Sequence, residues 1–182
     1  MLFHPKPSSL SPAWFFLFYK LMKEIQLTQG KVALVDDEDF DYLNQWKWYA
    51  KKCSKNGIFY AVRCITINNK NFAIYMHRFI LNNNDSKMHT DHRNGTTLDN
   101  RKENIRICTA SQNSINKKIN SRNKSGYKGI SFCNRSKRFV AEICLNGKRY
   151  YLGQFIDRKE AAKAYNIGAI KFHGEFAKLN NI

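Results

Sequence analysis

Four polar residues in one short stretch have the types and spacing needed to hydrolyse a phosphodiester. The stretch TDHRNGTTLDNRKENIRICTASQN holds Asp91, His92, Asn104 and Asn113, with twelve residues from His92 to Asn104 and nine from Asn104 to Asn113. A neutral histidine, whose unperturbed pKa is about 6.5, can take a proton from water. Carboxylate and amide oxygens can hold a divalent ion against a phosphate. The stretch therefore supplies a candidate base, His92, and two oxygen ligands for a metal.

The charge of the chain favours a polyanionic partner. Its 182 residues include 31 Lys and Arg against 14 Asp and Glu, a formal net charge of +17. From Lys117 to the end there are 15 basic and 4 acidic residues. Between Glu24 and Asp41 the balance is reversed, with six acidic residues and one basic residue, Lys31. This balance predicts binding to nucleic acid first and an anionic membrane second. We expect the acidic end to face away from DNA.

Composition excludes several other classes of protein. A hydrophobic fraction of 43% with 14% aromatics excludes a disordered chain. The five cysteines are odd in number and form no C-x-x-C pair, which predicts reduced thiols rather than a zinc cluster or a disulfide framework. The apolar run Ala13–Tyr19 is shorter than the roughly 20 residues of a membrane span. Residues 1–21 are predicted to be an extension without function.

The elements that must position the four polar residues can be placed from turn and capping signals. In residues 22–75 we expect a β-rich region, with a hairpin over 25–35 around Gln29-Gly30, an acidic segment, and strands over 58–67 and 72–75 around a turn at 68–71. Trp46 and Trp48 lie in the run Tyr42–Ala50, and core packing for this sheet is favoured over a base-stacking platform.

The central unit, residues 76–118, is predicted to be strand–strand–helix after a short helix. That short helix covers Met76–Leu81, and its His77-Arg78 pair either reaches a phosphate or has no second function. Strands are expected over Met88–His92 and Ile105–Cys108, with a loop opening at Asn94-Gly95. Thr109-Ala-Ser-Gln112 is a capping box, which places Asn113 in the first turn of the next helix.

A polar, basic linker over 119–126 is expected to run along a DNA backbone before a last domain, 127–182. Three strands are predicted there, followed by a helix capped by Asp157, with Glu160 three residues on, and ended by Gly174. The strands are Tyr127–Cys133, Arg138–Leu145 and Lys148–Phe155, with a type I′ turn at Asn146-Gly147. The fold class is therefore α+β: a small β-rich region, the central unit, and a three-stranded antiparallel sheet packed on one helix.

Residues 76–117 resemble the HNH homing-endonuclease family, through MHRFIL, DH, LDNRKENIRICT and QN. The resemblance implies a ββα-metal unit that binds one divalent ion and cuts one strand. It makes His92 the general base, Asp91 and Asn113 the metal ligands, and Asn104 the residue that braces the loop. Asn116 is an alternative ligand, although the spacing favours Asn113. Oxygen ligands favour Mg²⁺ or Mn²⁺ over zinc.

Residues 125–180 resemble the plant ethylene-response-factor (Apetala-type) DNA-binding domain, through SGYKGI, FVAEI, KRYYLGQF, EAAKAYNIGAIKFHG and AKLN. That family lays its sheet in the major groove, so residues of this sheet and of the linker are expected to contact DNA. Cys144 and Ser131 fall where plant members carry base-reading arginines, so the plant target sequence does not transfer. The expected DNA contacts are Lys117, Lys118, Arg122, Lys128, Ser131, Arg135, Lys137, Arg138, Glu142, Lys148, Arg149 and Tyr151.

This order of domains resembles the free-standing HNH endonucleases of phages and related mobile elements. It implies a site-directed enzyme acting on double-stranded DNA in the cytoplasm of a bacterial or phage-infected cell. With one site and no heptad repeat, we expect a monomer that nicks one strand, without a stable protein partner or a membrane. The alternative is a DNA-binding transcriptional regulator with a silent nuclease unit. RNA binding is disfavoured because the aromatic ribonucleoprotein signature is missing.

Overall fold

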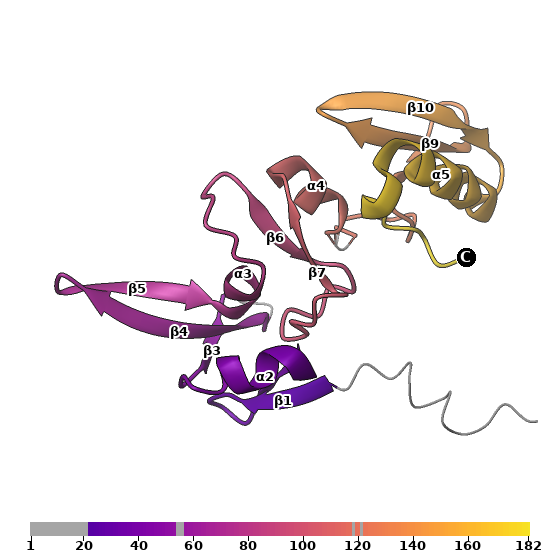
Figure 1. The fold of residues 1–182 in the computed structure, drawn as a ribbon. Coiled ribbons are helices and arrows are strands. Elements are labelled where there is room, and N and C mark those ends of the chain that lie inside the picture. The colour runs from indigo at the N-terminus through magenta and orange to yellow at the C-terminus, as the bar shows by residue number, and fades with distance from the viewer. Residues whose placement is uncertain (1–21, 54–56, 118, 121) are drawn as a thin grey trace, which may run out of the picture. The chain divides into compact units, whose positions relative to one another are not determined.

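A computed structural model describes residues 22–53, 57–117, 119–120 and 122–182 (Figure 1). These residues form four antiparallel sheets and four α-helices, a mixed α and β fold as expected. Contacts divide the chain into two compact units, Met1–Met76 with Thr97–Lys102, and His77–Thr96 with Glu103–Ile182. Each unit is described by itself. The predicted extension 1–21 and the predicted DNA contact Lys118 lie outside the described residues.

The first unit contains two small sheets and a helix. The hairpin predicted around Gln29-Gly30 is present, with positive φ angles of 63° and 62° at these two residues. The second sheet has the strand order β3-β4-β5, and its β4–β5 turn falls at Asn68-Asn69. The elements are β1 Met22–Gln26, β2 Val32–Asp36, α2 Asp37–Leu43, β3 Tyr49–Lys52, β4 Phe59–Ile67 and β5 Lys70–Tyr75.

Helix α2 differs from the prediction, which has an acidic segment but no helix at these residues. Its first turn holds Asp37, Glu38 and Asp39, whose charges are favourable at the positive end of a helix dipole. The Lys102 ammonium lies 2.9 Å from carboxylate oxygens of both Glu38 and Asp39. The local excess of acid is thus partly neutralised within the first unit, by a residue distant in sequence.

The two tryptophans of the first unit differ in burial. Trp48 is 2% exposed and donates a 2.9 Å hydrogen bond from its indole to the carbonyl of Leu43, so the prediction of core packing is confirmed for it. Trp46 is only partly buried, and the guanidinium of Arg63 lies 4.2 Å from its ring centre.

The nuclease-like part of the second unit matches its predicted elements closely. Strands β6 and β7 pair antiparallel and helix α4 packs on both of them. The predicted capping box is formed: the Thr109 hydroxyl accepts from the Gln112 amide at 3.2 Å, and the Gln112 side chain accepts from the Thr109 amide at 2.8 Å. The elements are α3 Met76–Ile80, β6 His89–His92, β7 Ile105–Cys108 and α4 Ala110–Ile115.

The C-terminal part of the second unit is a sheet of order β10-β9-β8 covered on one face by α5 (Figure 1). Small side chains of α5 let the helix lie close to the sheet. Tyr165 comes so near that a Cβ at Gly129 would lie 2.1 Å from its ring. Asp157 caps α5, and Asn146-Gly147 forms the predicted turn with positive φ at both residues. The elements are β8 Ile130–Cys133, β9 Arg138–Leu145, β10 Lys148–Phe155, α5 Arg158–His173 and the 3-10 turn η1 Gly174–Phe176.

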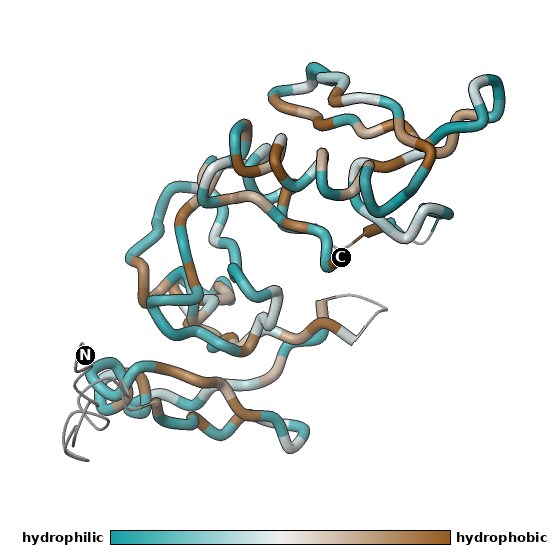
Figure 2. The backbone as a smooth tube through the Cα atoms, turned by 90° about the vertical axis from the view of Figure 1, so that its right-hand side faces the viewer, coloured by the Kyte–Doolittle hydropathy of each residue, from teal (hydrophilic) through white to brown (hydrophobic). Residues whose placement is uncertain are grey.

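Short hydrophobic stretches alternate with hydrophilic ones along the backbone (Figure 2). Among the described residues, none of the helices is long and apolar enough to cross a membrane. All five cysteines are free thiols, as the sequence predicted.

Candidate functional site

Asp91 and His92, which are consecutive in the sequence, are both buried in the β6–β7 hairpin. Each is 5% exposed, and in the hairpin register Asp91 lies opposite Arg106 while His92 lies opposite Ile105. One carboxylate oxygen of Asp91 accepts two hydrogen bonds from Arg106, from Nε at 3.0 Å and Nη2 at 2.8 Å. A cross-strand pair of this kind, bidentate and 9% or less exposed, fixes the orientation of the carboxylate.

Helix α4 supplies the second contact to Asp91, through Asn116. Among the described residues, Asn116 is the one in or capping this helix whose side-chain amide reaches Asp91, donating to its other oxygen at 2.8 Å. The same amide also donates to the carbonyl of His92 at 2.7 Å. Asn113 lies three residues earlier, on the same side of the helix, in the first turn that the capping box predicted. In the structure, the residue hydrogen-bonded to Asp91 is therefore Asn116, the alternative that the spacing did not favour.

Asn104 holds the start of the loop that follows His92. Its side-chain oxygen accepts a 2.9 Å hydrogen bond from the backbone N–H of Asn94, and its carbonyl accepts one from the N–H of Arg93 at 2.8 Å. These two hydrogen bonds fix the first residues of the loop that follows His92. Asn104 is 5% exposed, so it is buried within the hairpin.

The ring of His92 packs edge-on against the ring of His77, with centroids 5.1 Å apart and an angle of 78°. Burial lowers the pKa of His77 to about 3, with smaller contributions from the charges of His92 and Arg78. His77 is therefore neutral at neutral pH, so its ring packs against the candidate base without adding charge. Arg78 donates to the carbonyls of Met88 and Asp85, which ties down the segment before β6.

Arg106 is a site residue that sequence reasoning missed. Besides Asp91, it donates from Nη1 to the carbonyl of Glu175 at 2.6 Å, and its guanidinium lies 3.9 Å from the ring centre of Phe176. Arg93 adds an exposed 3.2 Å ion pair to the Glu175 carboxylate. The η1 turn of the C-terminal part thus contacts β7, the strand paired with the one that carries Asp91. Pairing the two predicted strands would have placed Arg106 opposite Asp91, but nothing in the sequence pointed to Glu175 or Phe176.

The face of the C-terminal sheet turned away from α5 gathers several of the predicted DNA contacts. Ala141 and Ile143 are buried toward α5, so the intervening Glu142 and Cys144 point to the other face. In the register, Tyr151 lies opposite Glu142 and Arg149 opposite Cys144. Arg149 is exposed and Tyr151 is 61% exposed, while Ser131 pairs with Val140 on the same face.

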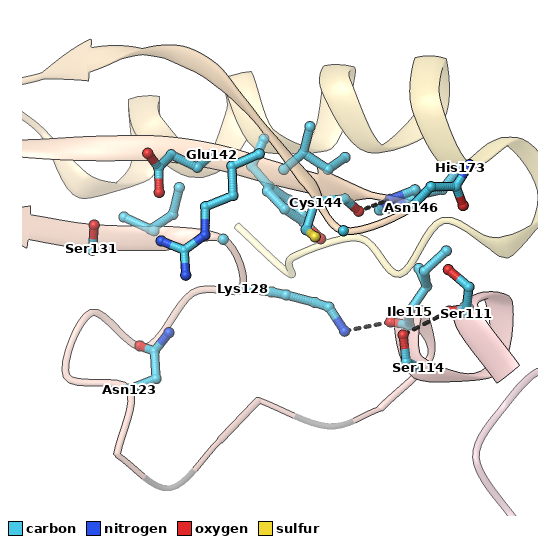
Figure 3. A pocket seen from close by; sticks show the side chains of 16 residues that line it. Ser111, Ser114, Ile115, Asn123, Lys128, Ser131, Glu142, Cys144, Asn146 and His173 are labelled. Carbon is cyan, nitrogen blue, oxygen red and sulfur yellow. Dashed lines mark hydrogen bonds between the residues drawn. The ribbon is translucent and has the colours of Figure 1, made fainter.

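Lys128, also predicted to contact DNA, has protein partners. Its ammonium donates to the carbonyl of Ile115 and, at 2.8 Å, to that of Lys117, which caps the last turn of α4. Burial, and then the charge of Lys178, lowers the pKa of Lys128. Figure 3 shows this side chain reaching from the turn before β8 toward Ile115. Lys128, Glu142 and Arg149 help to line a hollow of about 460 Å³.

The other predicted contacts lie at exposed turns and strand ends. Asn123 and Ser125 organise the predicted linker: Ser125 donates to the carbonyl of Ile130 at 2.9 Å, and Asn123 donates to that of Tyr127 at 2.8 Å. This end of the linker is a hydrogen-bonded turn, which is why β8 begins at Ile130 rather than at Tyr127. Six of these predicted contacts are exposed cations: Lys117, Arg122, Arg135, Lys137, Arg138 and Lys148.

Carboxylate and amide oxygens are the ligands that hard divalent ions prefer. In this structure both carboxylate oxygens of Asp91 accept hydrogen bonds, one from Arg106 and the other from Asn116. In the first unit, three acidic residues, Asp36, Glu38 and Asp39, have their ligand atoms within 4.8 Å of one another. Lys102 bonds to all three, through its ammonium to Glu38 and Asp39 and its backbone N–H to Asp36. That cluster is an ion-paired element of the first unit.

Comparison with known proteins relates the chain to two groups. No family model matches it. Over nearly its whole length it is similar to an uncharacterized HNH endonuclease of Acanthamoeba polyphaga mimivirus, 29% identical over 185 residues, covering 98% of this chain and 91% of the relative. A 56-residue stretch is 43% identical to APETALA2-like protein 2 of Oryza sativa and 42% identical to an AP2-like ethylene-responsive transcription factor of Arabidopsis thaliana. That stretch covers 31% of this chain, but only 13% and 12% of the two plant proteins.

Proposed function

We propose that the chain is a divalent-metal-dependent DNA endonuclease of the HNH type that nicks one strand of a duplex. Its nuclease unit is residues 76–118, and residues 127–182 form an Apetala-type DNA-binding domain joined to it by 119–126. The observation that carries the proposal is the burial of Asp91 and His92 under helix α4, with Asn104 closing the adjoining loop. The similarity to a named HNH endonuclease over 98% of the chain supports it.

In this reaction His92 takes the proton from the attacking water, and the neutral ring of His77 restricts the tilt of the His92 imidazole. Asp91 and Asn113 would hold Mg²⁺ or Mn²⁺, with Asn116 as the alternative amide. When bound, the ion neutralises charge on the phosphate and stabilises the leaving oxygen. Arg106 orients Asp91, and Asn104 keeps the loop after His92 in place.

Duplex DNA is the proposed partner of the C-terminal sheet. The outer face carries Arg149 and Tyr151, and exposed cations surround it at the turns. Phosphate contacts of this kind position a protein on a duplex, while the target sequence depends on base contacts by the sheet. A single nuclease site in one chain then acts on one phosphate at a time, as a monomer.

The test is nicking of supercoiled plasmids that carry a library of genomic fragments, with Mg²⁺ or Mn²⁺ and with chelator. Open circles should appear first and only with metal, and His92→Ala should remove them while DNA affinity stays within about twofold, because a base acts in the chemical step. Linear product that forms first, at a rate rising with the square of protein concentration, would contradict monomeric nicking. A His92→Ala rate above about one hundredth of wild type would show that His92 is not the base.

The amide ligand is resolved by a matched pair of variants, Asn113→Ala and Asn116→Ala. If Asn113 is the ligand, its loss should raise the metal concentration needed for half-maximal nicking, and weaken Mn²⁺ binding measured by calorimetry. Loss of Asn116 should chiefly lower the melting temperature, since its amide connects the end of α4 to the Asp91 side chain and to the His92 carbonyl, both on β6. The reverse result would assign the ligand role to Asn116.

A second candidate is a DNA-binding regulator whose nuclease unit is silent. The observation that favours it is the full engagement of Asp91, whose two carboxylate oxygens accept from Arg106 and Asn116. Under this alternative the chain binds duplex DNA with the same affinity with and without divalent ions, and never nicks it. The plasmid assay decides between the two functions.

A further inference from the structure

The first unit carries a projecting two-stranded arm that the nuclease model leaves without a role. Strand β3 pairs only with the Phe59–Val62 half of β4, so the distal half of the β4–β5 hairpin, from Cys64 to Ala73, extends beyond it (Figure 1). The arm ends in Asn68 and Asn69, both with positive φ, which gives a tight turn matched to the strand twist.

One face of this arm is apolar and exposed to solvent. The register pairs Ile65 with Phe72 and Ile67 with Lys70, which places these four side chains on the same face. Ile67 is 52% exposed and Phe72 is 48% exposed. A two-stranded ribbon is only marginally stable in water unless its apolar face is covered. The arm therefore has the chemistry of a surface that meets a partner.

Charge identifies the class of partner. Residues 42–76 contain six Lys and Arg and no Asp or Glu. Alternation along β4 places Arg63 on the same face, next to the base of the arm, and the register places Lys70 at its tip. Arg63 is held between Trp46 and Trp48, at 4.2 and 5.7 Å from their ring centres. A basic face without acids suits the phosphates of a nucleic acid.

We propose that the β4–β5 arm is a second DNA-binding element that lies in the major groove of duplex DNA. A B-form major groove, about 12 Å wide, admits a two-stranded ribbon, whereas the deep and narrow groove of A-form RNA does not. Lys70 contacts a phosphate, while Ile67 and Phe72 pack on thymine methyl groups and sugars. Binding to a second copy is opposed by the net charge of +17.

The proposal rests on DNA as the substrate, yet it can be tested without nuclease activity. Backbone hydrogen exchange of the full chain is measured with and without a duplex oligonucleotide of random sequence. Exchange in residues 64–73 should slow with duplex DNA and stay unchanged with double-stranded RNA. Equal exchange with and without DNA would overturn the proposal. So would slowing that appears without DNA as protein concentration rises, because it would assign the arm to self-association.

Matched variants provide the second measurement. Lys70→Ala should lower the slope of log affinity against log salt by about 0.9, the value for one lost phosphate contact. Lys163→Ala, which removes an exposed cation paired with Glu160 on α5, is the control and should leave the slope unchanged. Replacing residues 65–72 by Asn-Gly keeps the Cys64–Ala73 pair and should weaken duplex binding at least about tenfold without lowering the melting temperature.

Plasmid nicking by the wild-type chain separates failure of the arm from failure of the nuclease. If the wild type nicks DNA but the shortened arm binds the duplex as tightly as wild type, the arm proposal is wrong and the proposed function stands. If the arm is protected by DNA but no metal-dependent nicking occurs, the arm is a binding element of a protein that is not a nuclease.

Discussion

At the scale of single residues, two contacts of the site are not among those that the sequence predicts: Arg106 with Asp91, and His77, considered only for a phosphate contact, with His92. The Arg106 guanidinium donates hydrogen bonds to Asp91 and to the Glu175 carbonyl, and it lies over the Phe176 ring. His77 packs on the candidate base while remaining uncharged at neutral pH. Both residues act through another side chain, which is why motif spacing alone does not reveal them.

Replacing Arg106 by alanine should lower the free energy of unfolding by roughly 3–5 kcal/mol, because it leaves the buried Asp91 carboxylate without its cation. The check is urea unfolding followed by tryptophan fluorescence and circular dichroism. Arg106→Lys keeps the charge but loses the two-pronged contact, so its cost should be smaller. Destabilisation no greater than that of the exposed-site variant Lys163→Ala would contradict this account of Arg106.

His77 should make the protein sensitive to acid. Its folded pKa is lowered to about 3 from 6.5, so between these values the unfolded chain binds a proton that the folded chain does not. Stability is therefore fully present above pH 6.5 and falls as pH drops toward 3, by at most about 1.4 kcal/mol per pH unit from this group. Melting temperatures of wild type and His77→Gln, measured across this range, should converge in acid. A constant difference would show that His77 is not the source.

At the scale of elements, hairpins and caps followed from local signals, while contacts between distant segments did not. Asn146-Gly147, Asp157 and the Thr109 capping box each act within a few residues, and all three formed as predicted. Helix α2 was missed because its acids are accommodated by the helix dipole and by Lys102, over sixty residues away. The choice between Asn113 and Asn116 likewise depended on how α4 packs on β6, which spacing does not specify.

The close approach of α5 to its sheet gives a prediction about Gly129. Its φ is +72°, and an added Cβ would lie 2.1 Å from the Tyr165 ring and 2.6 Å from the Glu142 carbonyl. Gly129→Ala should therefore cost roughly 2–5 kcal/mol, from left-handed strain of about 1–2 plus overpacking of about 1–3. Gly147→Ala is the control, since its φ is +79° with open space around it, and it should cost only the strain. Thermal unfolding of both variants checks the difference; equal costs would contradict it.

At the scale of the whole molecule, the second unit joins its β6–β7 hairpin and α4 to its C-terminal part through specific side-chain contacts. Lys128 caps the end of α4, and Glu175 and Phe176 meet Arg106. The basic segment between them ends in a hydrogen-bonded turn around Asn123. DNA binding and chemistry are then expected to depend on each other.

Phe176→Ala tests this dependence in the full chain. Loss of the ring under Arg106 should slow single-turnover nicking at saturating DNA by about tenfold or more, because small displacements of positioned groups reduce catalysis strongly. Affinity for duplex DNA should change by less than about twofold. Tyr151→Ala, at a 61% exposed site on the outer face of β10, is the comparison and should alter affinity more than rate. A Phe176→Ala effect confined to affinity would argue against the link.

The contact between η1 and Arg106 also determines how this chain could be retargeted by protein engineering. A hybrid that exchanges everything after the linker for another binding module would lose Glu175 and Phe176, and would leave the Asp91–Arg106 pair facing solvent. Grafting new side chains onto the outer face of β9 and β10 instead retains Gly174–Phe176. To change the target sequence, it is therefore better to substitute residues on the existing sheet than to replace the whole domain.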